Sequence, residues 1–151
     1  EPVEIRRILS HVCELLRPEA AAREIEIATR IEASLPRVMA DPVRLTQALL
    51  NLLINAIQAV EKRGRVEVSA SVVEGRVCVV VNDNGPGIAP DRLAAVFDPY
   101  YTTKSEGSGL GLWIAQQIVT AHGGTLQAQN GPAGGAMLTM RLPLRTTNGQ
   151  G

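Results

Sequence analysis

Two asparagines spaced four residues apart, Asn51 and Asn55, lie within the most apolar segment of the chain. In a helix this spacing places both side chains on the same face. A buried amide is costly unless it has a partner. The pair therefore predicts one of two arrangements: an amide that bonds a loop carbonyl, or a neutral oxygen ligand for a hard cation such as Mg²⁺.

A second candidate site follows the apolar run 79–81, where the chain reads Asn82-Asp83-Asn84-Gly85-Pro86-Gly87. Asn, Gly and Pro all favour a turn that ends a strand. The functional alternative is that Asp83, at the edge of an apolar layer, accepts a hydrogen bond from the amino group of an adenine. In that case the glycines would let the flat base approach the backbone closely.

A third candidate is the glycine-rich segment 107–112, Gly-Ser-Gly-Leu-Gly-Leu, which opens a predicted helix. Free N–H groups and the helix dipole at such a start favour phosphate. The chain has no Gly-Lys-Ser/Thr sequence, which excludes a Walker loop, and the glycine spacing does not fit the dinucleotide fingerprint. Just before it, the segment 97–104, Phe-Asp-Pro-Tyr-Tyr-Thr-Thr-Lys, predicts an aromatic anchor for a loop, a phosphate-reaching Lys104, or both.

Apolar periodicity and turn residues predict the elements that would position these groups. We expect helices at 3–22, 42–62 and 110–121, strands at 24–30, 35–40, 65–73, 76–81, 125–129 and 136–142, and a long irregular stretch at 83–108. Helices intermixed with strands indicate an α/β fold, a two-layer α/β sandwich. Residues 1–144 are expected to form one domain and residues 145–151 a disordered tail.

Composition limits the partners. The chain has 151 residues, and 15 basic residues balance 15 acidic ones. A neutral chain has no global attraction to nucleic acid or to an anionic membrane, and its apolar runs are shorter than the roughly 20 residues of a membrane span. We therefore expect neither nucleic-acid binding nor membrane insertion. Cys13 and Cys78 are expected to be buried apolar residues in a reducing compartment, which fits a cytoplasmic location.

Taken in order, these blocks resemble the ATP-binding catalytic domain of bacterial sensor histidine kinases. That domain belongs to a class shared with gyrase, the heat-shock chaperone ATPases and MutL. Asn51-Leu-Leu-Ile-Asn55-Ala resembles the N box, and Asp83-Asn-Gly-Pro-Gly87 the first glycine box. Residues 97–104 resemble the F box, and residues 107–112 the second glycine box.

The resemblance implies a Bergerat fold, in which a mixed, mostly antiparallel sheet is covered on one face by three helices and a long ATP lid spans about 84–108. It implies ATP and Mg²⁺ as cofactors, with Asn55 as the metal ligand and Asp83 as the adenine acceptor. Asn51, Asn55 and Lys104 would be catalytic. The implied nucleotide site comprises Asn51, Asn55, Asp83, Gly85, Gly87, Ile88, Thr102, Thr103, Lys104, Ser108, Gly109, Leu110, Gly111 and Leu112.

The implied activity is transfer of the γ-phosphoryl group of Mg²⁺-ATP to a histidine on the dimerisation domain of the same kinase. A response-regulator receiver domain would then take the phosphate. His11 is not followed by the family's acceptor motif, so the acceptor would lie upstream of Glu1. His11 and His122 are accordingly predicted to be ordinary helix residues. We expect this segment to be monomeric, whether or not the parent kinase is anchored in a membrane.

Two departures from the kinase pattern, at Gln58 and Ala136, leave alternatives open, whereas Asn51 differs only from the wider class of ATPases. Asn51 occupies the position where hydrolytic relatives have a glutamate base, and an amide cannot accept a proton from water at neutral pH. Gln58 replaces a basic residue that many relatives carry, and Ala136 replaces a threonine. A nucleotide-binding regulatory module without transferase activity therefore remains an alternative. So does a serine kinase of the anti-sigma-factor type.

Overall fold

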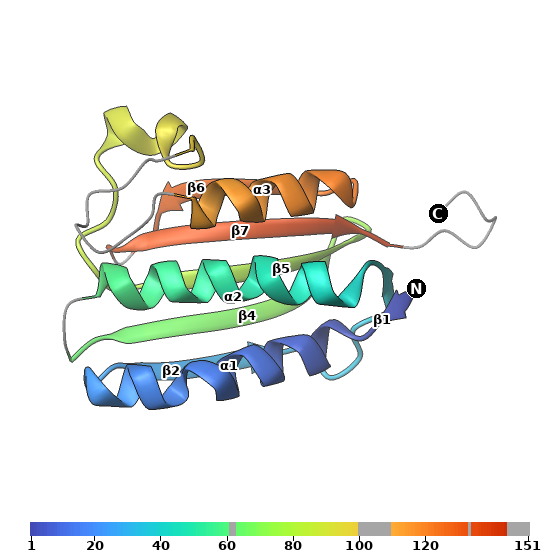
Figure 1. The fold of residues 1–151 in the computed structure, drawn as a ribbon, viewed down its shortest axis with the longest axis horizontal. Coiled ribbons are helices and arrows are strands. Elements are labelled where there is room, and N and C mark those ends of the chain that lie inside the picture. Colours follow the sequence, from blue (N-terminus) through green and yellow to red (C-terminus); the bar gives the residue numbers. More distant parts are fainter. Residues whose placement is uncertain (61–62, 100–109, 133, 145–151) are drawn as a thin grey trace.

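The fold consists of a helical layer packed on one face of a β-sheet (Figure 1). The structure is a computed structural model that describes residues 1–60, 63–99, 110–132 and 134–144. Its elements in chain order are β1 (Pro2–Val3), α1 (Ile5–Ala22), β2 (Glu26–Ile31), β3 (Val38–Met39), α2 (Pro42–Ala59), β4 (Arg65–Val73), β5 (Arg76–Asp83), the 3₁₀ helix η1 (Pro90–Ala95), α3 (Gly111–Ala121), β6 (Thr125–Asn130) and β7 (Ala136–Pro143).

The main sheet has five strands in the order β2-β4-β5-β7-β6. Only β2 and β4 pair in parallel, whereas the other three pairings are antiparallel. The mixed, mostly antiparallel sheet expected from the sequence is therefore confirmed. The β4–β5 hairpin turns at Glu74 and Gly75, whose φ angles are +51° and +74°. Two positive φ angles give the turn a twist that suits a tight hairpin.

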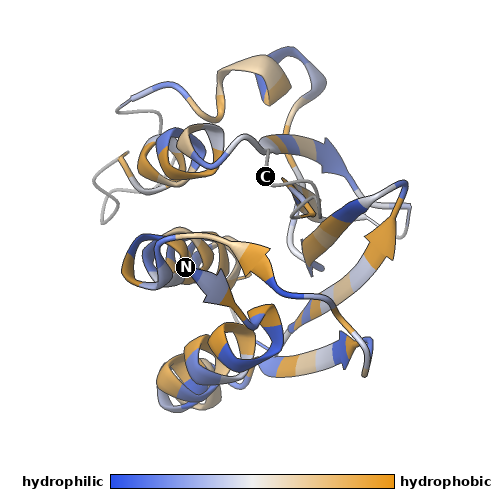
Figure 2. Ribbon diagram, turned by 90° about the vertical axis from the view of Figure 1, so that its right-hand side faces the viewer, coloured by the Kyte–Doolittle hydropathy of each residue, from blue (hydrophilic) through white to orange (hydrophobic). Residues whose placement is uncertain are grey.

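Three helices among the described residues, α1, α2 and α3, cover one face of this sheet, as expected (Figures 1 and 2). Each turns its apolar side toward the strands, because hydrophobic positions recur every three or four residues. The buried residues of α2 illustrate this spacing: Leu45, Ala48, Leu49, Leu52, Leu53, Ala56 and Ile57. In the described part of the chain, no helix has the length and apolarity that crossing a membrane requires.

Helix α2 begins where the sequence predicts and ends earlier than predicted. The Asp41 carboxylate accepts hydrogen bonds from the N–H groups of Val43 and Arg44, at 3.0 and 3.3 Å. This N-cap, with Pro42 at the first helical position, fixes the start. The helix was expected to reach residue 62, but it ends at Ala59 because Val60 has an extended backbone and turns its side chain into the core.

Residues 2–3 and residues 90–95 also differ from the expected elements. Residues 2–3 form a strand rather than the first helical turn, since they pair with residues 38–39. Residues 90–95 form a 3₁₀ helix within the segment expected to be irregular, and Val96 after it is buried. The expected tail, 145–151, and residues 100–109 of the expected lid lie outside the described residues.

Strands β5 and β7 come unusually close where β5 ends and β7 begins. Gly135 has a φ of +76°, and a Cβ atom added to it would lie 1.9 Å from the carbonyl oxygen of Asp83. Only glycine fits a position that is both left-handed and in backbone contact. The neighbouring Gly134, with a φ of +92°, has open space at its Cβ position.

Substituting alanine at Gly134 and at Gly135 separates the cost of a left-handed backbone from the cost of steric overlap with the neighbouring strand. Gly134→Ala is expected to cost about 1–2 kcal/mol, the penalty for a left-handed residue with a Cβ. Gly135→Ala should lose a further ~1–3 kcal/mol, because the strands must move apart. Urea unfolding of both variants measures the difference, and equal losses would contradict the close approach.

Candidate functional site

The central polar group of the site is the Asp83 carboxylate, which is only 4% exposed. Its Oδ1 accepts hydrogen bonds from the backbone N–H of Gly85 at 2.8 Å and of Ala136 at 3.2 Å. Among the described residues, nothing donates a hydrogen bond to Oδ2. The described residues thus hold the carboxylate by Oδ1 alone and leave Oδ2 available to a further donor.

Two physical effects act on this carboxyl in opposite directions. Burial raises the pKa of Asp83 above its ordinary value of 3.8, because a low-dielectric surrounding disfavours the charge. The N–H groups of Gly85 and Ala136 act in the opposite direction by stabilising the ionised form. Ala136 lacks the hydroxyl that its position often carries in the resembled family, yet its main-chain N–H still serves the carboxylate.

The turn after Asp83 is fixed from two sides. A Cβ on Gly85 would lie 2.6 Å from the carbonyl oxygen of Ala59, so the turn presses against the end of α2. Asn130, at the end of β6, accepts a hydrogen bond from the N–H of Ile88 at 2.7 Å and donates one to the Ile88 carbonyl at 2.8 Å. Gly87, with a φ of +83°, lies against the same amide.

The sequence did not single out Asn130. Its only local signal is an asparagine followed by Gly131, which suits an ordinary turn. Its partner is 42 positions away in the sequence, so the contact exists only once β6 has been placed beside the segment that follows β5.

The two asparagines of α2 have different surroundings. Asn51 donates a hydrogen bond from Nδ2 to the carbonyl of Gly111 at 3.1 Å, which attaches α2 to the first turn of α3. Asn55 is half-buried, and its side chain makes no hydrogen bond within the described part of the chain. Asn51 is thus the bonded amide that the sequence offered as one alternative, and the role of Asn55 as an oxygen ligand stays a prediction.

The start of α3 presents main-chain groups rather than a capping side chain. Leu110 is the N-cap residue and makes no side-chain cap, and Gly111 and Leu112 form the first turn. The first N–H groups of a helix have no partner within it and carry partial positive charge. The other predicted phosphate ligands, Thr102, Thr103, Lys104, Ser108 and Gly109, lie outside the described residues.

One face of α2 connects these parts. Asn51, Asn55 and Ala59 recur every four residues, so they lie in a row along the helix. Asn51 contacts the start of α3, and the Ala59 carbonyl borders the turn after Asp83. The two ends of the row are separated by roughly 12 Å at 1.5 Å per residue, and Asn55 lies midway. The described residues contain no cluster of three or more His, Cys, Asp or Glu residues suited to a metal.

Known proteins resemble this chain along most of its length. The family model described as histidine kinase-, DNA gyrase B-, and HSP90-like ATPase matches residues 40–146. The sensor histidine kinase ZraS of Escherichia coli strain K12 is 43% identical over 147 residues, which are 97% of this chain and 32% of ZraS. The chain therefore spans about a third of the length of the curated relatives it matches.

Two solved structures are similar along nearly the whole chain. Full-length ShkA in complex with AMPPNP is 38% identical with a TM-score of 0.85, over 97% of this chain and 31% of ShkA. The histidine kinase ThkA in complex with the response regulator TrrA is 26% identical with a TM-score of 0.84, over 96% of this chain and 42% of ThkA.

The raised pKa of Asp83 predicts a specific pH dependence of stability. The folded state holds the proton more tightly than the unfolded state, so this contribution is present below about pH 4 and is lost as pH rises through the folded pKa. Urea unfolding of wild type and Asp83→Asn between pH 4 and pH 7 should show wild type losing stability relative to the variant as pH rises. A relative gain would contradict the assignment.

Proposed function

Because the chain belongs to the family of histidine kinase-, DNA gyrase B- and HSP90-like ATPases, we propose that it binds Mg²⁺-ATP and transfers the γ-phosphoryl group to a histidine on the dimerisation domain of its kinase. The similar proteins ZraS, a sensor histidine kinase, and ThkA, a histidine kinase, support this proposal. A response-regulator receiver domain is the proposed final acceptor. ThkA, a similar kinase, is known in complex with such a regulator.

The observation that carries this proposal is the row Asn51, Asn55 and Ala59 along α2. One end of the row lies at an uncapped helix start, which suits phosphate, and the other lies at a carboxylate with an available oxygen. A nucleotide needs both groups at a fixed separation. The adenine amino group would donate to Oδ2 of Asp83, and the phosphates would accept from the N–H groups at Gly111 and Leu112.

The surroundings of Asn55 fit a magnesium ion held mainly by the nucleotide. Mg²⁺ takes oxygen ligands and usually binds through substrate phosphates with few protein groups. The half-buried amide of Asn55 has no partner among the described residues, and no acidic cluster there competes for the ion. When bound, the metal would neutralise phosphate charge during transfer.

Asn51 favours transfer over hydrolysis. Its amide is engaged with the Gly111 carbonyl, and an amide is no base for activating water. The protein's contribution is therefore to position the phosphates against an acceptor brought from outside. His11 is exposed on α1, without any of the groups that form the candidate site, so the acceptor is proposed on another domain. Lys104, Thr102 and Thr103 are proposed to complete the phosphate site, and the expected lid, 84–108, is proposed to close over the nucleotide.

Asp83→Asn tests the adenine contact. The amide can still accept hydrogen bonds from Gly85 and Ala136, but it presents N–H groups to the adenine amino group. ATP affinity should fall by about 1.5–3 kcal/mol, or roughly 10- to 150-fold. Guanine presents an acceptor where adenine has a donor, so the preference for ATP over GTP should narrow in calorimetric titrations. Unchanged ATP affinity would sink the contact.

Asn55→Ala tests the metal contact and the transfer reaction together. The domain, Mg²⁺-ATP and the dimerisation domain of the same kinase are mixed, and acid-labile phosphohistidine is measured. Wild type should phosphorylate the histidine, and the variant should be at least about 10-fold slower, because a loss of ~1.4 kcal/mol gives that factor. ATP binding without Mg²⁺ should be equal in both. ATP binding by wild type without transfer would indicate a regulatory module instead.

A further inference from the structure

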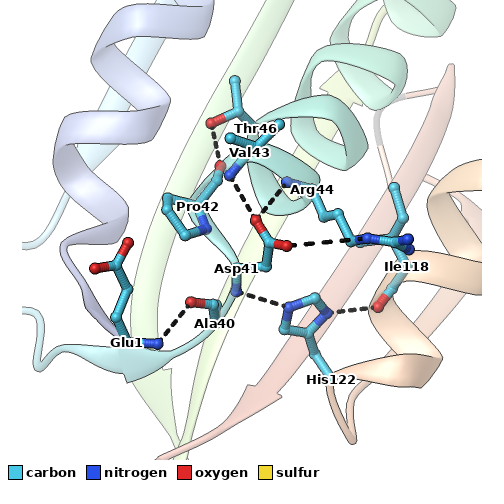
Figure 3. A network of polar contacts seen from close by, with 9 residues as sticks. All are labelled: Glu1, Ala40, Asp41, Pro42, Val43, Arg44, Thr46, Ile118 and His122. Carbon is cyan, nitrogen blue, oxygen red and sulfur yellow. Dashed lines mark hydrogen bonds and ion pairs between the residues drawn. The ribbon is translucent and has the colours of Figure 1, made fainter.

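The imidazole of His122 joins the end of α3 to the start of α2 (Figure 3). Its Nε2 lies 3.0 Å from the backbone nitrogen of Asp41, and its Nδ1 lies 2.8 Å from the carbonyl oxygen of Ile118. Asp41 is 81 positions away in the sequence and is the residue that caps α2. The ring therefore connects two helix ends that share no local sequence.

The partners fix where the ring proton lies. The Asp41 N–H is a donor, so Nε2 must offer a lone pair. The Ile118 carbonyl is an acceptor, so Nδ1 must carry the proton. Both contacts are satisfied only by the neutral imidazole in its Nδ1–H form. A second proton, at Nε2, would place an N–H group against the Asp41 N–H.

Side-chain hydrogen bonds thus fix α3 to α2 near both ends. At the start of α3, Asn51 bonds the Gly111 carbonyl, and at its end His122 bonds Asp41. Between them α3 buries Ala115, Ile118 and Val119, and its Leu112 and Ile114 are partly buried against the core. Apolar packing is non-directional, so it resists separation of the helices more than sliding. The two directional bonds set the position of α3 along its axis.

We propose that His122 is a positioning residue for the nucleotide site, active only as the neutral imidazole. This inference rests on the proposed function, because the groups it positions are the N–H groups at the start of α3. Protonation of His122 releases Asp41, the axial position of α3 becomes less fixed, and nucleotide affinity falls. The experiment therefore varies pH, because protonation would add an N–H at Nε2 opposite the Asp41 N–H.

Charged groups near the ring come from the start of α2 and from the chain beside β3. Strands β6 and β7 carry one charged residue, Arg141, whose guanidinium donates to Gln127. The Asp41 carboxylate accepts from the N–H groups of Val43 and Arg44, and the Arg44 guanidinium lies 4.0 Å from it. The amino group of Glu1 donates to the Ala40 carbonyl, and Glu1 also brings a carboxylate. Helix α3 itself carries no Asp, Glu, Lys or Arg. The group that faces Nε2 is still the Asp41 N–H. These charges therefore do not remove the conflict between two N–H groups that a proton at Nε2 would create.

The matched variants are His122→Gln and His122→Phe. His11→Gln is the control, because His11 is the other histidine of the chain and is exposed on α1. The glutamine oxygen can accept from the Asp41 N–H at every pH, whereas phenylalanine cannot accept at all. The first measurements need no nucleotide. Ring ¹⁵N shifts at pH 8 should show Nδ1–H. The protection factor of the Asp41 amide, which corrects for the slower intrinsic exchange at low pH, should fall on acidification in wild type and not in His122→Gln.

The second measurement is the ATP dissociation constant from pH 8 to pH 5.5 in wild type and the variants. ATP's own titration is common to all of them. One hydrogen bond corresponds to a roughly 2- to 10-fold change in an equilibrium. Wild type and His11→Gln should therefore lose affinity about 2- to 10-fold more than His122→Gln. His122→Phe should be weak at every pH, with a flatter profile than wild type.

The outcomes separate this inference from the proposed function. Equal pH profiles in wild type and His122→Gln, with ATP bound by both, would overturn the positioning role and leave the function intact. Failure of every variant and of wild type to bind ATP would overturn the proposed function. A protection factor of the Asp41 amide that is the same at pH 8 and at pH 5.5 in wild type would overturn the inference independently of nucleotide binding.

Discussion

The site depends on keeping one carboxylate ionisable at the end of an otherwise apolar strand. A buried charge is costly unless it is hydrogen-bonded, and the backbone N–H groups of Gly85 and Ala136 provide those bonds to Asp83. Both donors reach the carboxylate only because the chain comes very close at two glycines. Gly85 lies against the last carbonyl of α2, and Gly135 against the carbonyl of Asp83 itself. The hydrogen bonds to Asp83 therefore form only if the backbone packs this closely.

Helix α2 relates the separate parts of the site to one another. It is fixed at its start by the Asp41 cap, and it buries an apolar face against the sheet. One row of its residues then contacts the start of α3 and the turn after Asp83. The rise per residue of an α-helix is constant, so helix geometry sets the distance between the base-binding group and the phosphate-binding group. Loops on either side can vary without changing it.

Much of the fold and most of the chemical groups were predictable from local pattern. Alternating and three-to-four-residue periodicities located the strands and helices, the Glu74–Gly75 turn predicted a hairpin, and the spacing of Asn51 and Asn55 indicated a shared helix face. These features depend on neighbours within a few positions. The ends of elements were less predictable, because the pairing of residues 2–3 with 38–39 and the inward turn of Val60 depend on distant contacts.

The sequence by itself determined which chemistry was available: a carboxylate after an apolar strand, two amides on one helix face, and glycines at a helix start. Only the tertiary structure decided which of these groups are engaged and which are available. It joined Asn51 to Gly111, left the Asn55 amide without a partner among the described residues, and brought Asn130 to Ile88 and His122 to Asp41. The physical reason is that a hydrogen bond across 42 to 81 positions depends on how the layers pack, and local sequence carries no record of it.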